Sequence, residues 1–227
     1  MSGTNRARRD DYPWQSLLLI GLLAVEIAVF SAIGTNFFTL DNFFQVPRLN
    51  VELGLLALAL TPVIVTGGID LSVGALAGLA AVLFGMMTNV YGVPILPAAI
   101  ATLILAAAGG GLNALVITRL KIPALIVTLG TMSLFRGLAE GMTEGVANYT
   151  NFPASFLFFG QGYLAGGVPA QLPVFLLFAG AIWLLLHRSI IGRSLVAIGF
   201  SPVGARFAGI PVARRAHHKR TGRRSSR

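Results

Sequence analysis

Residues 51–88 read VELGLLALALTPVIVTGGIDLSVGALAGLAAVLFGMMT, which is two long apolar runs separated by a short polar, glycine-rich segment. A helix of about 20 apolar residues is long enough to cross the hydrocarbon core of a bilayer. In lipid only helices and closed barrels satisfy all their backbone hydrogen bonds, and nothing here alternates like a barrel strand. The stretch therefore predicts membrane helices and an all-α, polytopic membrane bundle.

The same pattern continues outward in both directions from this stretch. Apolar runs that reach or approach the length of a membrane span lie at residues 14–33, 51–66, 70–88, 94–118, 122–139 and 171–187. Glycine, proline or charged residues interrupt the chain between the runs, as expected for connecting loops. We expect about six membrane segments in a bundle that covers residues 14–198, preceded by a basic cytoplasmic amino terminus at residues 1–13.

The composition supports a membrane protein and excludes several other classes. Hydrophobic residues make up 55% of the chain, charged residues only 11%, and the mean hydropathy is +0.78, whereas soluble domains carry about 25% charged residues. The absence of cysteine excludes disulfide scaffolds, thiolate metal sites and cysteine nucleophiles. Seven of the seventeen Lys and Arg residues lie in residues 214–227. This charge is typical of a basic patch at a membrane face, so we expect a lipid bilayer and no nucleic acid as partner.

The basic residues also predict the orientation of the chain. If six segments cross the membrane, three of the connecting segments lie on one side. Their basic residues are Arg6, Arg8, Arg9, Arg119, Lys121, Arg188 and Arg193. The opposite side would receive the mixed charges around residues 41–52 and the mostly uncharged loop at residues 141–170. By the positive-inside rule the amino terminus is expected in the cytoplasm, with the protein in a bacterial plasma membrane.

The densest polar cluster is TGGIDLSVG at residues 66–74. An ionisable residue among apolar runs is expensive in a membrane and is by default a functional hypothesis. Two interpretations are open: Asp70 or Ser72 caps a helix that starts at the cytoplasmic surface, or a broken helix lines a polar path through the bundle. The candidates for a translocation path are Gly67, Gly68, Asp70, Ser72 and Asn113.

Other glycines and charged residues have simpler interpretations. Gly74 with Gly78, and the run at residues 109–111, favour close packing between helices. Arg136 and Glu140 have the spacing of a helical ion pair. No Gly-Lys pair occurs, so a Walker-type nucleotide site is excluded and any ATP must be bound by another chain.

Four ordered segments carry a resemblance to a known family. They are GGIDLSVG at 67–74, GLNA at 111–114, KIPALIVTLGTM at 121–132 with FRGL at 135–138, and GR at 192–193 followed by AIGFSP at 197–202 and ARFAGI at 205–210. The chain resembles the permease subunits of ribose-type ABC importers, the monosaccharide branch of the binding-protein-dependent transporters. The resemblance runs from about residue 14 to Val212.

The resemblance implies a membrane permease that imports a monosaccharide and has no enzymatic activity, metal or cofactor of its own. It implies a second permease subunit, identical or different, and a periplasmic sugar-binding protein. It also implies an ATPase subunit on the cytoplasmic face, which binds ATP and Mg²⁺.

Residues 199–212 then resemble the cytoplasmic segment that couples the permease to the ATPase. Its candidate residues are Gly199, Pro202, Ala205, Arg206 and Gly209. Proline can start a short helix, the arginine projects a cation, and the two glycines permit sharp turns at the ends.

Other functions and a peculiarity of the carboxyl end stay open. The solute could instead be a polyol, a nucleoside or a furanose-like signal, and an ion-coupled secondary carrier could use Glu26 and Asp70 on its path. No apolar residue larger than alanine follows Val212, so we expect residues 213–227 to be a disordered basic tail. The end resembles a truncated or frame-shifted permease, which could be a non-functional fragment; a polybasic lipid anchor is the alternative.

Overall fold

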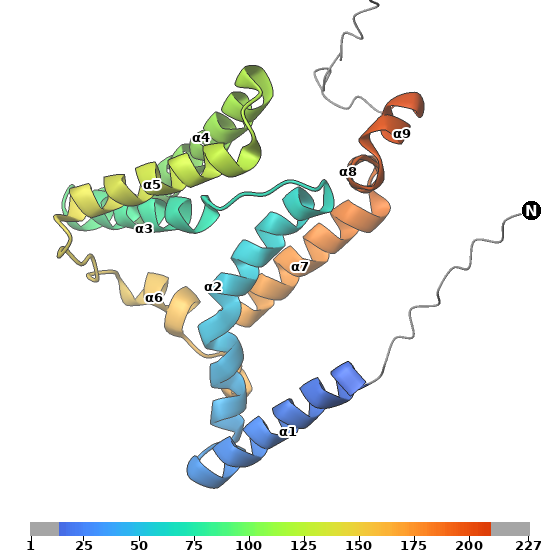
Figure 1. Cartoon of the computed structure of the whole chain (residues 1–227). Coiled ribbons are helices and arrows are strands. Elements are labelled where there is room, and N and C mark those ends of the chain that lie inside the picture. Colours follow the sequence, from blue (N-terminus) through green and yellow to red (C-terminus); the bar gives the residue numbers. More distant parts are fainter. Residues whose placement is uncertain (1–13, 210–227) are drawn as a thin grey trace, which may run out of the picture. The chain divides into compact units, whose positions relative to one another are not determined.

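The computed structural model describes residues 14–209, apart from the side chains of Gln15 and Pro202, and these residues are helical almost throughout (Figure 1). The elements are α1 (Trp14–Ile33), α2 (Leu40–Val65), α3 (Val73–Asn89), α4 (Ile95–Leu120), α5 (Ala124–Thr143), α6 (Ala154–Gln161), the 3-10 turn η1 (Ala165–Gly167), α7 (Gln171–Arg188), α8 (Ile190–Phe200) and α9 (Pro202–Phe207). The expected segments at residues 1–13 and 213–227, and the last three residues of the coupling segment, lie outside the described part. The all-α prediction is confirmed.

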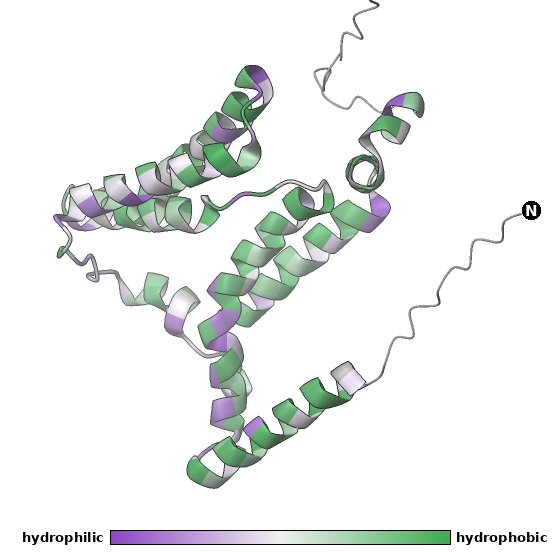
Figure 2. Ribbon diagram, viewed as in Figure 1, coloured by the Kyte–Doolittle hydropathy of each residue, from purple (hydrophilic) through white to green (hydrophobic). Residues whose placement is uncertain are grey.

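Four of the described helices, α1, α2, α4 and α7, are long and apolar enough to cross a membrane. These helices are mainly hydrophobic (Figure 2), little of each span is buried within the chain, and none of residues 16–33 in α1 is buried. Such surfaces are stable in lipid but not in water. The protein is therefore a polytopic helical membrane protein, as predicted. The predicted fifth run forms α5. The predicted third run forms α3, which has only 17 residues because residues 70–72 stay outside the helix.

The predicted second run was too short. The helix α2 starts at Leu40, eleven residues before the predicted start, and continues through Pro47. The polar residues between 41 and 50 are not part of an apolar run, so this part of the helix was not predicted. A membrane helix can nevertheless extend beyond the hydrocarbon core into the headgroup region, where polar side chains are solvated. At 26 residues, α2 is about 39 Å long, close to the full thickness of a bilayer with its headgroups.

Contacts divide the chain into two compact units, residues 1–47 and residues 48–227. In the described part of the first unit, α1 leads through a turn into α2, and Phe37 lies stacked 6.5 Å from Phe30. In the second unit α3, α4 and α5 pack side by side (Figure 1).

A small core lies where these three helices meet. The buried side chains include Leu79, Ala98, Val127, Thr128 and Phe135. A Cβ atom on Gly109 would lie 2.7 Å from Leu76 Cδ1 and 3.3 Å from Phe135 Cζ, so the predicted close packing is confirmed at this glycine.

The other glycines of the packing prediction behave differently. No atom lies within 4 Å of a Cβ added to Gly74, Gly78, Gly110 or Gly111, so these four make no close helix contact within the described chain. The prediction was therefore wrong for them within one chain, because the spacing of glycines identifies a smooth helix face but not what lies against it.

Two further helices escaped prediction. The predicted loop at residues 141–170 contains α6 and η1, and the segment after the sixth run contains α8. Helices of eight and eleven residues are too short to give a clear apolar period. A tight corner joins α7 to α8: the Ser189 hydroxyl accepts a hydrogen bond from the Gly192 N–H at 2.9 Å, and a Cβ on Gly192 would collide with the backbone of Leu185 and Leu186.

Candidate translocation and coupling site

The glycines of the polar cluster end α2. The Gly68 N–H donates to the carbonyl of Val63 and the Gly67 N–H to that of Ile64, each at 2.9 Å. Gly67 has φ of +77°, which is the left-handed conformation. These two bonds and the left-handed residue form a Schellman motif, which satisfies the last carbonyls of a helix. Gly67 and Gly68 thus place the polar segment that follows, and their lining of a translocation path stays a prediction.

Replacing Gly67 by alanine should destabilise this helix end by about 1–2 kcal/mol, because a side chain is strained in the left-handed region. Thermal unfolding of the purified protein in detergent would measure the loss. Gly110→Ala is the matched control, since it lies within α4 with open space around it and should be neutral or slightly stabilising. Equal unfolding temperatures for Gly67→Ala and the unaltered protein would contradict the assignment.

A chain of hydrogen bonds joins three of the predicted path residues. Asp70 Oδ1 accepts from the Ser72 N–H at 2.9 Å and from the Ser72 hydroxyl at 2.7 Å. Asn113 Nδ2 in turn donates to Ser72 Oγ at 2.8 Å. Because Ser72 and Asn113 are 41 residues apart, this contact attaches the start of α3 to the last third of α4.

Burial makes this chain of bonds important for the local structure. Ser72 is fully buried and Asn113 is 4% exposed, while Asp70 is half-buried. The Ser72 side chain accepts no hydrogen bond from the first N–H groups of α3, so the capping role that the sequence allowed for Ser72 does not occur. Asn113 Oδ1 is buried and has no hydrogen-bond partner among the described residues. An unpaired buried acceptor is costly. The hydrogen bonds of Asp70, Ser72 and Asn113 therefore hold the two helices together, while Asn113 Oδ1 keeps the capacity to accept a further hydrogen bond.

The coupling segment touches the end of α2. A Cβ atom on Gly199 in α8 would collide with the backbone carbonyl of Val65, and Thr66 Cα would lie 3.4 Å away. Gly199 is therefore required for the close approach of these two backbones. The structure brings the predicted coupling segment into contact with the segment that begins the polar cluster at residue 66.

Beyond this contact the chain turns into the short helix α9. Ser201 Oγ accepts from the Gly204 N–H at 3.0 Å, and the helix begins at Pro202 as predicted. Ala205 is 3% exposed, whereas Arg206 is exposed. Gly209 follows with φ of +77°. Ala205 therefore faces inward, and Arg206 places a cation on the exposed side of α9.

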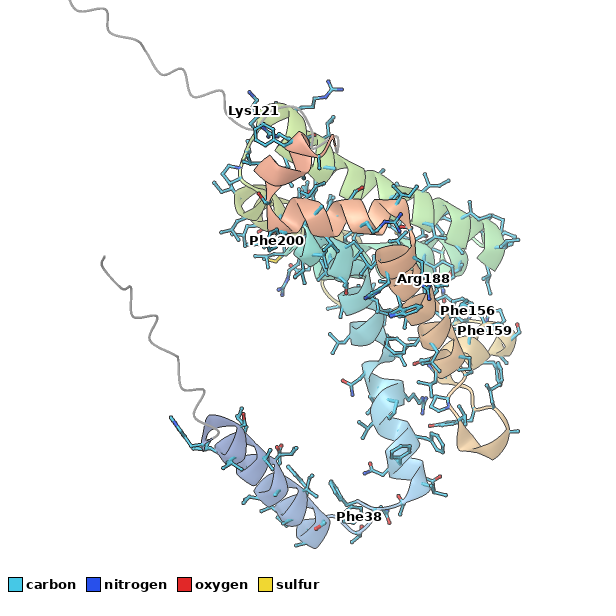
Figure 3. The ribbon with its side chains drawn as sticks, turned by 90° about the vertical axis from the view of Figure 1, so that its right-hand side faces the viewer. Phe38, Lys121, Phe156, Phe159, Arg188 and Phe200 are labelled. Carbon is cyan, nitrogen blue, oxygen red and sulfur yellow. The ribbon has the colours of Figure 1, made fainter. Side chains whose placement is uncertain are left out.

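Sequence reasoning missed the aromatic residues of this segment. Phe200 and Phe207, which precede and end α9, are 94% and 90% exposed, and Val203 is 62% exposed. Figure 3 shows Phe200 at the end of α8, remote from Arg188 at the end of α7. Aromatic residues in a predicted cytoplasmic loop were the available signal, because a loop facing water has little use for exposed phenylalanine.

The ion pair that the spacing of Arg136 and Glu140 allowed is present, but it lies apart from these contacts in the chain. Arg136 Nε and Glu140 Oε1 are 2.8 Å apart on α5, and both side chains are largely exposed. Exposed pairs of this spacing contribute little to stability, because solvent screens the charges. The pair therefore serves the surface of α5.

Comparison with known proteins assigns the family. The model of the family described as branched-chain amino acid transport system, permease component, matches residues 42–216. This chain belongs to that permease family. The resemblance to importer permeases is thereby confirmed, and the family is one of transport permeases and not of enzymes.

The relatives of the permease carry a more specific description. The autoinducer 2 import system permease protein LsrD of Escherichia coli (strain K12) is 38% identical over 211 residues, as is its counterpart in Shigella flexneri. The aligned region covers 91% of this chain and 63% of each relative, so the permease spans less than two thirds of their length. No solved structure matches the chain.

Proposed function

We propose that the permease forms the translocation path of a binding-protein-dependent ABC importer and couples it to a separate ATPase. The observation that carries this proposal is the contact between Gly199 and the backbone at Val65. It connects the segment that would meet the ATPase with the end of α2, directly before the Gly67–Asp70 turn. Movement of α8 and α9 against a partner would therefore act on the polar cluster through rigid backbone.

The exposed surface of α9 has the chemistry of a docking element. Phe200, Val203 and Phe207 offer apolar anchors, and Arg206 adds a cation among them. Short helices commonly bind a partner by inserting such anchors into a groove, with aromatic residues contributing most of the affinity. The partner is the ATPase, which binds ATP and Mg²⁺, because this chain has no nucleotide motif.

The solute is a monosaccharide or a related small polar molecule. The relatives are named for import of autoinducer 2, while the family description names branched-chain amino acids. The hydrogen-bonded side chains of Asp70, Ser72 and Asn113 favour a hydroxyl-bearing solute over an aliphatic one, because they offer hydrogen-bonding atoms. A second permease subunit and a periplasmic binding protein complete the importer.

The permease is proposed to lie in the bacterial plasma membrane with its amino terminus in the cytoplasm. A reporter enzyme that is active only outside the cytoplasm should therefore be active when fused after Asn148. It should be inactive when fused after Lys121 or Arg193, because basic loops stay inside. Immunoblots of the fusions control for expression. The opposite pattern of activity would contradict this orientation.

Uptake in proteoliposomes tests the function. The vesicles would hold the permease, the ATPase and the binding protein, and accumulation of labelled D-ribose would be measured with and without ATP. We expect accumulation that requires both ATP and the binding protein. Uptake driven by a proton or sodium gradient without ATP would indicate a secondary carrier instead.

A further inference from the structure

A pocket of about 560 Å³ lies at the start of α7, well away from the polar cluster. Its walls come from α2, from the segment around Tyr149, from α6 and from the first residue of α7, Gln171. Because α7 is 18 residues long, its start is about 27 Å from its end, where α8 and α9 follow. The residues that line the pocket therefore lie at the opposite end of α7 from α8 and α9; Figure 1 shows α6 near the start of α7.

The wall of this pocket is fixed by contacts with α3. Phe84 stacks on Phe152 with ring centroids 5.6 Å apart, and it packs at a tilt against Phe156 with centroids 5.2 Å apart. Tyr149 packs directly against Gly85, where an added Cβ would lie 2.5 Å from the tyrosine Cβ. The segment between α5 and α6 is thus held in place, which preorganises the pocket.

The lining combines aromatic faces with a few polar groups. Phe156 and Phe159 lie together on α6 (Figure 3). Gln171 donates its amide N–H to the carbonyl of Gly160, while its Oε1 is buried and has no partner among the described residues. The carboxylate of Glu52 and the amide of Gln161 add further hydrogen-bonding groups. Aromatic surfaces beside hydrogen-bonding groups are typical of sites for small molecules, and the volume is in the usual range.

Charge narrows the class of ligand. Glu52 is the one charged residue among the described residues that line the pocket, so its formal charge is negative. A carboxylate accepts hydrogen bonds from hydroxyl groups and repels phosphate. The aromatic rings can cover the apolar face of a sugar ring.

We propose that this pocket is an entry site for an uncharged, polyhydroxylated solute, which the permease holds before translocation. The carboxylate of Glu52 accepts hydrogen bonds from solute hydroxyls, and Phe159 packs against the ring. Phosphorylated sugars are rejected by Glu52. The proposal rests on the importer function proposed above, but binding to this site needs neither ATP nor the other subunits.

Equilibrium dialysis of the permease in lipid nanodiscs against radiolabelled D-ribose tests this site. We expect saturable binding of D-ribose and much weaker binding of D-ribose 5-phosphate. Glu52→Gln should weaken ribose binding by about tenfold, as expected for loss of a charge-assisted hydrogen bond, and should reduce the discrimination against the phosphate. Phe159→Ala, at a position 65% exposed, should also weaken ribose binding.

Matched controls separate the site from general effects. Glu144→Gln and Phe178→Ala remove the same groups outside the pocket and should bind D-ribose like the unaltered protein. Circular dichroism would establish that all variants keep their helix content. Absence of saturable ribose binding, or equal binding by Glu52→Gln, Phe159→Ala and the controls, would overturn the proposal. ATP-driven uptake in the same preparations would show whether the importer function holds independently.

Discussion

Replacing Gly199 by alanine is expected to uncouple ATP hydrolysis from uptake. The new Cβ atom would collide with the carbonyl of Val65, and backbone cannot rotate aside as a side chain can. Such overpacking costs about 1–3 kcal/mol, which corresponds to roughly a 5- to 150-fold change in an equilibrium between two arrangements. ATP-dependent accumulation of labelled D-ribose in the complete importer should fall by a similar factor.

Gly204→Ala is the matched control for this substitution. Its added Cβ would lie 3.3 Å from Ser201 Oγ, a contact that a small side-chain shift relieves, and alanine favours the α9 helix. Uptake by Gly204→Ala should be close to normal. Co-purification of the ATPase with both variants would show whether docking itself persists. Normal uptake by a well-expressed Gly199→Ala importer would refute the role of this contact in coupling.

Replacing Asp70 should have the second large effect, and two substitutions separate its possible roles. Asp70→Ala removes the acceptor of both the Ser72 N–H and the Ser72 hydroxyl, which are buried. Each buried donor left unpaired costs about 1–3 kcal/mol, so both the unfolding temperature and uptake should fall. Asp70→Asn keeps an oxygen at the same place without the charge, and should restore the unfolding temperature.

Uptake by Asp70→Asn distinguishes the two interpretations of the polar cluster. If Asp70 orders only the start of α3, uptake should recover together with stability, since the hydrogen bonds are kept. If the carboxylate contributes to the path, uptake should stay at least about tenfold low while the unfolding temperature is normal, as for a lost charged hydrogen bond. We expect the second result, because Asp70 is half-buried and is linked through Ser72 to Asn113, whose Oδ1 has no partner among the described residues. Unchanged uptake and stability in Asp70→Ala would contradict both interpretations.

The helical membrane architecture could be predicted because it depends on local composition. A run such as residues 14–33 must be helical in lipid whatever its neighbours are, and the structure begins and ends α1 at the same residues. The sequence predicted helices wrongly where a helix contains polar residues or is very short. Leu40 begins α2 although polar residues and Pro47 follow, and Ala154–Gln161 forms a helix too short to give a periodic signal.

For the candidate site, too, the sequence identified residues but not their contacts. Residue types alone identified Asp70, Ser72 and Asn113 as polar groups that an apolar bundle must accommodate, and family motifs identified Gly199 and α9. Their partners could not be predicted. The bond from Asn113 to Ser72 depends on how α4 is placed along α3, and no local pattern encodes that placement.

The amino-acid sequence by itself determined that this protein lies in lipid, that it is helical and which family it belongs to, and it named the candidate residues of the site. The tertiary structure alone decided that Gly199 lies against the backbone of α2, that Asn113 holds Ser72, and that aromatic rings, Glu52 and Gln171 line one pocket. The physical reason is the range of the forces involved. The free energy of transferring apolar residues into lipid is a sum over one local segment of the sequence. Close packing and hydrogen bonding instead depend on the positions, to within ångströms, of residues far apart in the chain.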